Sequence, residues 1–191
     1  MSIDPGPILL ALARCAIARQ LGQTCNSEFD ATWLQAPGAT FVTLTRGGEL
    51  RGCIGTLEAH RPLLEDVQAN AVAAALRDPR FAPLSLAEWA DTRLEVSLLS
   101  ASEPLLFDSE QQALAQLRPG IDGIILTDGR HRSTFLPQVW AQLPNPSTFL
   151  AHLKQKAGLA ANAWSPSLQL ARYTVRKWQE PTPHRQTEQS K

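Results

Sequence analysis

The chain has 191 residues, of which 43% are hydrophobic and 19% charged, a composition typical of a globular protein. Its 18 basic and 18 acidic residues give a formal net charge of zero. Because duplex-binding proteins neutralise phosphates with a basic surface, this balance argues against nucleic-acid binding. No apolar run approaches the roughly 20 residues that span a bilayer, and no signal-peptide pattern occurs. We therefore expect a cytoplasmic protein that does not enter a membrane.

Cysteine and histidine spacing argues against a disulfide framework and against a metal site. The three cysteines, Cys15, Cys25 and Cys53, are odd in number and lack C-x-x-C spacing. We therefore expect no disulfide framework and a reducing compartment. The four histidines show neither H-x-x-x-H nor H-E-x-x-H spacing. The sequence accordingly predicts no metal ligands and no cofactor.

Helical and alternating patterns succeed each other in the first half. Apolar residues recur at helical spacing before Gly22, a residue type that commonly ends helices. Ser85 and Glu88 have the spacing of a capping box. The predicted elements are a helix over 7–21, a β-hairpin with strands 41–45 and 50–55, a helix between 62 and 78, a short helix over 85–89 and a strand over 94–98.

The second half repeats this order. Asp128-Gly129 is a strong turn signal, and Asn145 precedes a proline as a helix cap does. The predicted elements are a hairpin with strands 124–127 and 131–136, helices over 137–143 and 145–158, and a strand over 168–178 with a bulge near its middle. Aligning the turn glycines of the hairpins places Arg51 over Arg132, Gly52 over Ser133 and Cys53 over Thr134.

These patterns predict an α+β fold of two intimately joined subdomains, each with a β-hairpin, helices and a further strand. The two halves form an internal pseudo-repeat in this interpretation. We expect a single domain over 1–180, with lobes over 1–105 and 106–180. The polar segment 181–191 is predicted to be disordered.

The segment 50–56, Leu-Arg-Gly-Cys-Ile-Gly-Thr, places a guanidinium, a thiol and two glycines in a predicted strand. Glycine weakens a strand and usually marks a bulge or a close approach to the backbone. Residues two apart on a strand face the same way, so Arg51 and Cys53 should project together. A nearby cation stabilises a thiolate, which makes Cys53 a candidate nucleophile. The alternative is that Cys53 packs as a small buried hydrophobe.

Two arginines are candidates for an anion clamp. Arg51 and Arg132 occupy equivalent places in the two predicted hairpins, and paired guanidinium groups hold carboxylate or phosphate. Small residues at Gly52, Gly55 and Ser133 favour the clamp, because they let a ligand reach backbone N–H groups. The alternative for each arginine is an ion pair, for which the sequence offers Glu49, Glu58 and Glu95.

Three further side chains of the second half are weaker candidates. His131 would act as a base toward Cys53 if the two halves face each other, and otherwise is an exposed residue near the turn. Thr134 aligns with Cys53 and is assigned to substrate binding together with Arg132. The Gln138 amide would bond either a ligand or a buried backbone group.

Five segments of the chain resemble the AMMECR domain family, which occurs from archaea to humans. They are 50–55, 78–81, 95–100, 135–139 and 156–159, and the hexapeptide Leu-Arg-Gly-Cys-Ile-Gly is the family's signature. The resemblance spans roughly 9 to 180. It assigns the signature positions to Arg51, Gly52, Cys53 and Gly55, and a second motif to 135–139.

The resemblance implies an α+β fold of two joined parts with a cleft between them. It also implies one component of a three-part system, with a Memo-like protein of extradiol dioxygenase fold and a radical SAM protein as partners. An enzyme or enzyme subunit would then modify an unknown small-molecule or protein substrate through Cys53 and the arginines. The alternative is a non-enzymatic protein-binding adaptor module, in which the hexapeptide builds a tight turn.

Overall fold

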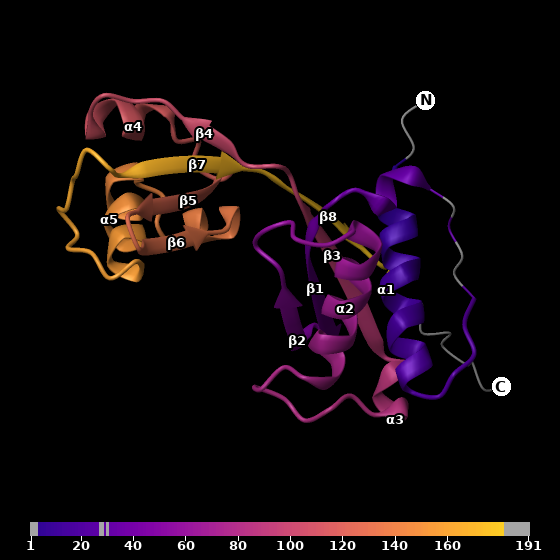
Figure 1. The fold of residues 1–191 in the computed structure, drawn as a ribbon. Coiled ribbons are helices and arrows are strands. Elements are labelled where there is room, and N and C mark those ends of the chain that lie inside the picture. The colour runs from indigo at the N-terminus through magenta and orange to yellow at the C-terminus, as the bar shows by residue number, and fades with distance from the viewer. Residues whose placement is uncertain (1–3, 27–28, 30, 182–191) are drawn as a thin grey trace. The chain divides into compact units, whose positions relative to one another are not determined.

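The computed structural model describes residues 4–26, 29 and 31–181, and contacts within the chain divide it into two compact units (Figure 1). The first unit comprises Met1–Leu98 and Arg176–Lys191, and the second comprises Leu99–Val175. Among the described residues, no helix is long and apolar enough to cross a membrane. The predicted disordered segment falls, apart from residue 181, outside the described residues.

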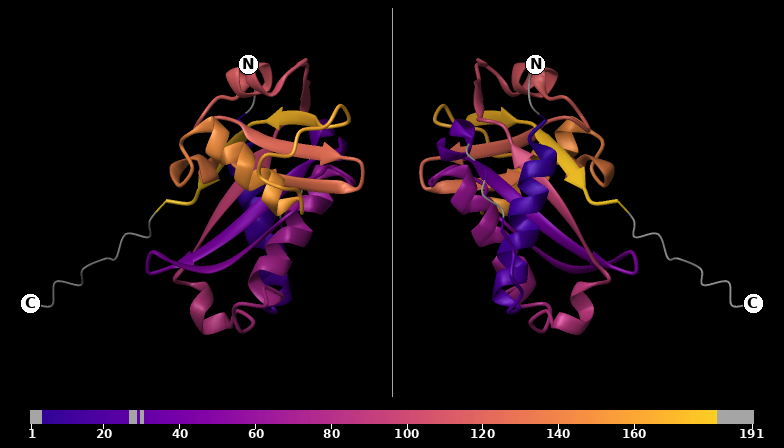
Figure 2. Two further views of the ribbon diagram at one scale, coloured as in Figure 1. Left: turned by 90° about the vertical axis from the view of Figure 1, so that its left-hand side faces the viewer. Right: turned by 90° about the vertical axis from the view of Figure 1, so that its right-hand side faces the viewer.

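The first unit packs two long helices on a four-stranded sheet with the order β2-β1-β3-β8 (Figure 1). The two strands of the hairpin form a ribbon that ends in its tight turn, as Figure 2 shows from two sides. The elements are α1 (Gly6–Gln20), η1 (Thr32–Gln35), β1 (Ala39–Arg46), β2 (Glu49–Gly55), α2 (Leu63–Leu76), α3 (Leu86–Trp89), β3 (Thr92–Leu99) and β8 (Val175–Gln179).

Buried and half-buried side chains alternate along β1, and this shows which face of the sheet the helices cover. Val42 and Leu44 are fully buried in the core with Leu12 of α1 and Val67 of α2. Thr43, between them, is only half-buried and points to the other face. We call the side of the sheet that carries Phe41, Thr43 and Cys53 the open face of the first sheet, because the described helices α1 and α2 pack on the opposite side, against Val42 and Leu44.

The second unit has the same kind of layering. Its sheet has the order β4-β7-β5-β6, and the Trp140 and Phe149 rings stack 3.7 Å apart in its core, next to Ile124 and Leu126 of β5. The elements are β4 (Glu103–Leu105), α4 (Glu110–Gln116), β5 (Gly123–Asp128), β6 (His131–Phe135), η2 (Pro137–Ala141), α5 (Pro146–Lys156) and β7 (Gln169–Tyr173).

The predicted α+β class is confirmed, and the last predicted strand differs from the structure. The segment 168–178 forms two strands separated by Thr174, with β7 in the second sheet and β8 in the first. The contacts divide the chain after Leu98, and they return β8 from Arg176 onward to the first unit. The lobes over 1–105 and 106–180 stay a prediction. Both sheets place the second hairpin strand at an edge, and the internal repeat stays a prediction.

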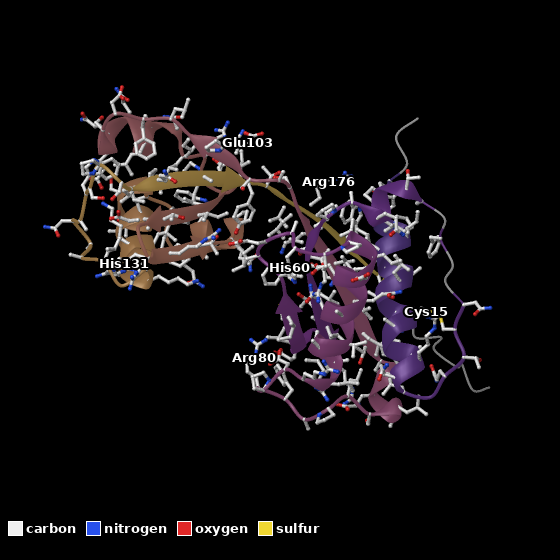
Figure 3. All side chains as sticks on the ribbon, in the orientation of Figure 1. Cys15, His60, Arg80, Glu103, His131 and Arg176 are labelled. Atoms are coloured by element: carbon white, nitrogen blue, oxygen red, sulfur yellow. A yellow bond between two sulfur atoms is a disulfide. The ribbon has the colours of Figure 1, made fainter. Side chains whose placement is uncertain are left out.

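The expectation of no disulfide is wrong for two of the three cysteines. Cys15 and Cys25 form a disulfide, with Cα atoms 5.4 Å apart (Cys15 is labelled in Figure 3). Cys15 lies on the fully buried side of α1, and the chain reverses after the helix at Gly22, whose φ is +78°. A left-handed glycine at this place lets the chain turn back, which brings Cys25 beside the helix. Cys53 alone is a free thiol.

The glycines of the hexapeptide make room for neighbouring parts of the first unit. A Cβ at Gly52 would lie 2.1 Å from the carbonyl oxygen of Ala74 in α2. A Cβ at Gly55 would lie 2.1 Å from the Phe41 ring. The close approaches expected of a ligand are therefore made by a helix backbone and by an aromatic side chain.

Replacing Gly52 by alanine is expected to destabilise the fold, because the backbone oxygen of Ala74 moves only with α2. Overpacking of this kind costs about 1–3 kcal/mol. Gly55→Ala is the matched control, since the half-buried Phe41 ring can turn away. Urea denaturation should show a larger loss for Gly52→Ala than for Gly55→Ala. An unchanged midpoint for Gly52→Ala would contradict this packing.

Candidate functional site

Cys53 lies on the edge strand β2, where its backbone bonds to side chains instead of a further strand. Its N–H donates to Asp78 Oδ2 at 2.9 Å, and its carbonyl oxygen accepts from Arg80 Nη2 at 3.2 Å. A neighbouring strand would offer one acceptor and one donor at this place. The loop after α2 supplies both with a carboxylate and a guanidinium (Arg80 is labelled in Figure 3). The backbone of Cys53 is thereby fixed on its outer side.

The two side chains of this loop also hold each other. Arg80 donates to both carboxylate oxygens of Asp78, from Nε at 2.9 Å and from Nη2 at 2.6 Å. This pairing, with the backbone N–H groups of Cys53 and Arg80, holds the pKa of the Asp78 carboxyl well below its usual range. Asp78 is therefore a buried carboxylate with bonded oxygens, whereas Arg80 reaches solvent with half of its side chain.

The Cys53 thiol is half-buried, and its Sγ lies 3.3 Å from Thr43 Oγ1 on β1. Cys53 and Thr43 are direct cross-strand partners. Because the Cys53 backbone bonds outward to the loop, this is a pair without mutual backbone bonds, in which side chains approach most closely. The thiol thus lies on the open face of the first sheet with a hydroxyl beside it.

Arg51 occupies a β-bulge, since Leu44 pairs with Gly52 and Thr45 pairs with Leu50. The simple rule that residues two apart share a face therefore does not apply to Arg51 and Cys53.

The Arg51 guanidinium binds groups of its own unit. Nε donates to Glu88 Oε1 at 3.0 Å, and Nη2 donates to the carbonyl oxygen of Ala82 at 2.9 Å. Nη1 is buried and has no hydrogen-bond partner among the described residues. The bond to Arg51, together with the backbone and hydroxyl of Ser85, lowers the pKa of Glu88 from 4.5 to about 2. Arg51 therefore forms an ion pair, as the alternative interpretation expected, and its partner is Glu88.

The candidate residues of the second unit lie in and after β6. His131 is exposed, and its Nδ1 lies 2.8 Å from the carbonyl oxygen of Ala157 (Figure 3). Arg132 is exposed. The Thr134 hydroxyl lies 3.1 Å from the Tyr173 hydroxyl. Of the others, Gln138 is exposed on η2, and Ser133 is buried on the helix side of the sheet, where its hydroxyl donates to the carbonyl oxygen of Leu153.

The structure brings together only part of the predicted site. Arg51, Gly52, Cys53 and Gly55 share one strand of the first unit, whereas the remaining candidates belong to the second unit. A cleft shared by both sets stays a prediction. Within the described part of the chain, no group of three or more His, Cys, Asp or Glu side chains is arranged to hold a metal ion.

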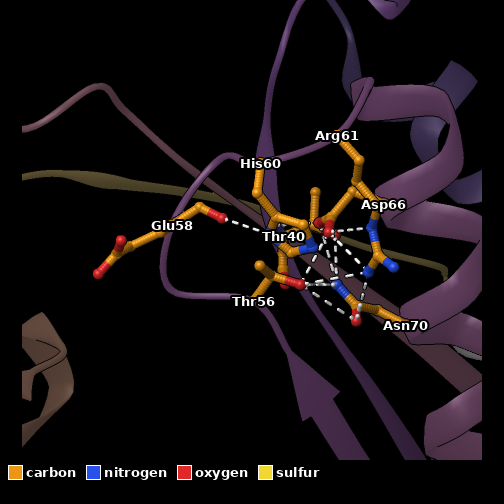
Figure 4. A network of polar contacts seen from close by, with 7 residues as sticks. All are labelled: Thr40, Thr56, Glu58, His60, Arg61, Asp66 and Asn70. Atoms are coloured by element: carbon orange, nitrogen blue, oxygen red, sulfur yellow. Dashed lines mark hydrogen bonds and ion pairs between the residues drawn. The ribbon is translucent and has the colours of Figure 1, made fainter.

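A polar network that the sequence did not predict surrounds Asp66, which is fully buried in the first turn of α2 (Figure 4). Asp66 Oδ2 accepts from the N–H and the hydroxyl of Thr40, at 2.8 and 2.7 Å. Oδ1 accepts from Thr56 Oγ1 at 2.7 Å and from Arg61 Nε at 2.9 Å. Asn70 Nδ2 donates to Oδ2 at 3.0 Å. The network ties β1, α2 and the segment after β2 together.

Comparison with known proteins identifies the family. The model of the AMMECR1 family matches residues 10–178. The chain belongs to the AMMECR1 family.

Relatives of similar length support this. A protein of Methanothermobacter thermautotrophicus is 34% identical over 94% of this chain and 96% of its own. Protein MJ0810 of Methanocaldococcus jannaschii is 34% identical over 96% and 94%. The crystal structure of the uncharacterised protein PH0010 from Pyrococcus horikoshii matches with a TM-score of 0.78 and 31% identity, over 96% of this chain and 95% of that one. The expected resemblance is confirmed.

Acid should destabilise this AMMECR1-family protein partly through Glu88. Its pKa is about 2 in the fold and 4.5 without its partners, so between these values the unfolded chain binds a proton that the folded chain does not. Stability should therefore fall as the pH is lowered through this window, and Asp78 acts in the same direction.

Glu88→Gln should make the unfolding midpoint in urea less dependent on pH across this range, although it lowers stability at neutral pH. Glu49→Gln, an exposed change on β2, is the matched control and should keep the full dependence. Equal acid slopes for Glu88→Gln and the unaltered protein would show that the pairing with Arg51 does not persist in solution.

Proposed function

We propose that this AMMECR1-family protein is an enzyme or an enzyme subunit whose reacting group is the Cys53 thiol. The observation that supports this most strongly is the combination of a free, half-buried thiol with a fixed backbone. Reactive cysteines need access to substrate and a polar surrounding, whereas inert ones are enclosed by apolar groups. Cys53 has the Thr43 hydroxyl at its sulfur and the Asp78–Arg80 ion pair at its backbone.

In this proposal the sulfur serves as a nucleophile or covalent carrier. The thiol proton leaves to solvent, and the thiolate sulfur adds to an electrophilic carbonyl carbon of the substrate, whose C=O π electron pair moves onto the oxygen. The Thr43 hydroxyl can donate a hydrogen bond to the anionic sulfur. Arg51, two residues before Cys53 on β2, is the proposed partner of an acidic group of the substrate.

The same proposal includes the partners that the family resemblance implies. The protein would act with a Memo-like protein and a radical SAM protein on an unknown small-molecule or protein substrate. Family membership supports this part of the proposal. The reaction with the substrate and the assembly with partners are separable, since the first needs Cys53 and the second needs a surface.

Alkylation tests the thiol directly. Without reductant Cys15 and Cys25 are paired, so iodoacetamide labelling followed by mass spectrometry reports Cys53 alone. At neutral pH Cys53 should react faster than the cysteine of an unstructured peptide with the sequence of 50–56. Thr43→Val should slow the reaction, whereas Thr45→Val, the next half-buried residue on the same face of β1, should not. A rate below that of the peptide would contradict nucleophilic use.

The biological test is Cys53→Ser, which keeps the size and polarity of the side chain but removes the nucleophilic sulfur. The proposal expects loss of activity in a cell that depends on this gene, with an unchanged unfolding midpoint. Full activity of Cys53→Ser would end the enzymatic version.

Activity that survives this change would favour the second candidate, a non-enzymatic protein-binding adaptor module. A specific observation supports this candidate. Leu50 and Leu86 are 43% and 52% exposed, and each is close in sequence to one end of the Arg51–Glu88 pair. In this candidate function the two leucines contribute apolar area to a protein-binding surface. An adaptor would lose partner binding when both leucines are changed to serine and would keep it in Cys53→Ser.

A further inference from the structure

A hollow lies on the second sheet, on the side that faces away from the helices of this unit. Ile124 and Leu126 of β5 are fully buried in the core, together with Phe149 of α5. Ile125 and Thr127 alternate with them, are only half-buried and therefore point to the opposite side. The hollow on this side has a volume of about 330 Å³, within the size range of small-molecule sites.

The floor of the hollow is apolar. Ile125 of β5 pairs with Ala171 of β7, which in turn pairs with Pro104 of β4, so these side chains form one row across three strands. Leu106, which follows β4, also lines the hollow and is 84% exposed. A leucine that leaves this much of its surface in water is stabilised when an apolar ligand covers it.

A pair of neutral polar side chains lies at one end of this floor. Thr127 of β5 and Gln169 of β7 are direct cross-strand partners and both line the hollow, so a hydroxyl and an amide stand next to each other. Neither side chain has a hydrogen-bond partner among the residues that the structure describes. By contrast, the Thr134 hydroxyl on the same face lies 3.1 Å from the Tyr173 hydroxyl. The hydroxyl and the amide at the hollow are therefore available to a ligand.

The groups available to a ligand carry no charge. Arg132 is the one charged residue among the described residues that line the hollow, and it takes part in another interaction, so no ligand contact is assigned to it. The other polar side chains of the lining belong to Ser102, Thr127 and Gln169 and are neutral. A charged head group would lose its hydration at this place without gaining a counter-charge, which disfavours ionic ligands.

We infer that this hollow binds a small uncharged carboxamide with an apolar body. The Gln169 amide and the Thr127 hydroxyl can each donate and accept a hydrogen bond, and a carboxamide group offers the matching acceptor and donors in one plane. Side chains two residues apart along a strand are separated by about 7 Å, so the apolar body would reach Ile125 and Ala171 from this pair. It would also remove Leu106 from water.

Carboxamide binding does not depend on the proposed reaction at Cys53, because all lining residues belong to the second unit. A failure of carboxamide binding would leave the alkylation result unchanged, and slow alkylation of Cys53 would leave carboxamide binding unchanged. The two proposals can therefore be rejected separately.

A titration of the full chain, labelled with ¹⁵N, with hexanamide tests the site by NMR. We expect saturable shifts in the millimolar range or below, centred on the backbone amides of Thr127, Gln169 and Ala171 and on the side-chain NH₂ group of Gln169. Sodium hexanoate adds a charge to the same chain, and hexan-1-ol offers only a hydroxyl, so each should bind about three- to tenfold more weakly. Shifts that do not saturate, shifts centred elsewhere, or hexanoate or hexan-1-ol binding as tightly as hexanamide would overturn the assignment.

Two variants identify the residues that recognise the ligand. Gln169→Leu should remove the preference for hexanamide over hexan-1-ol, because the side chain that bonds the carboxamide loses its amide. Gln155→Leu, the same change at an exposed position of α5 outside the hollow, should keep this preference. Ala171→Leu fills the hollow and should abolish binding of hexanamide, which keeps the test decisive if Gln169→Leu does not fold. An unchanged preference in Gln169→Leu or unaltered binding in Ala171→Leu would contradict the proposal.

Discussion

The outer edge of the first sheet is held by side chains, and the geometry of Cys53 depends on this arrangement. An edge strand presents unpaired N–H and C=O groups, which attract other chains unless they are covered. Asp78 and Arg80 cover those of Cys53 and neutralise each other as they do so. Because the backbone is satisfied outward, the cysteine faces Thr43 across β1 as a closely spaced pair. The position of the thiol is therefore set by a loop 25 residues further along the chain.

Both units have the same layered arrangement. Helices cover one face of a four-stranded sheet, and the other face carries partly exposed side chains. The open face of the first sheet carries Cys53, and that of the second carries Arg132. Helices pack on one face of each sheet, and this explains the small residues in β2 and β6, the second strand of each hairpin. Gly52 admits the Ala74 carbonyl group of α2, and Ser133 donates to the Leu153 carbonyl group of α5. These residues contribute to packing, and the neighbouring positions remain available for function.

Patterns of residues that are close in sequence predicted many of the helices and strands. Contacts between residues that are distant in sequence could not be predicted from such patterns. The hairpins, the capping box at Ser85 and the Asn145 cap depend on residues a few positions apart, and the structure contains them. The division of 168–178 between two sheets leaves no local trace, since both halves read as strand. The three-residue β4 and the polar α4 are too short or too polar to show a period.

The candidate site stays a prediction, and the contacts around its residues were accessible to the sequence only where they are local. The free cysteine on a hairpin strand follows from the sequence, but the partners of its neighbours do not. Glu88 reads as a helix cap, and its second bond to Arg51 spans 37 residues. Asp66 reads as an ordinary acidic residue in a first helical turn, and its burial appears only when Thr40 and Asn70 converge on it. Likewise, Cys15 and Cys25 pair because the chain reverses after α1.

Hydrogen exchange at the amide of Cys53 tests the central claim most directly. An unpaired amide on an edge strand exchanges quickly, whereas one bonded to a buried carboxylate is protected. The account predicts slow exchange at Cys53 in the unaltered protein and much faster exchange in Asp78→Ala, with the amides of β1 still protected. Rapid exchange at Cys53 in the unaltered protein, or protection that persists in Asp78→Ala, would show that the loop does not hold the strand that carries the thiol.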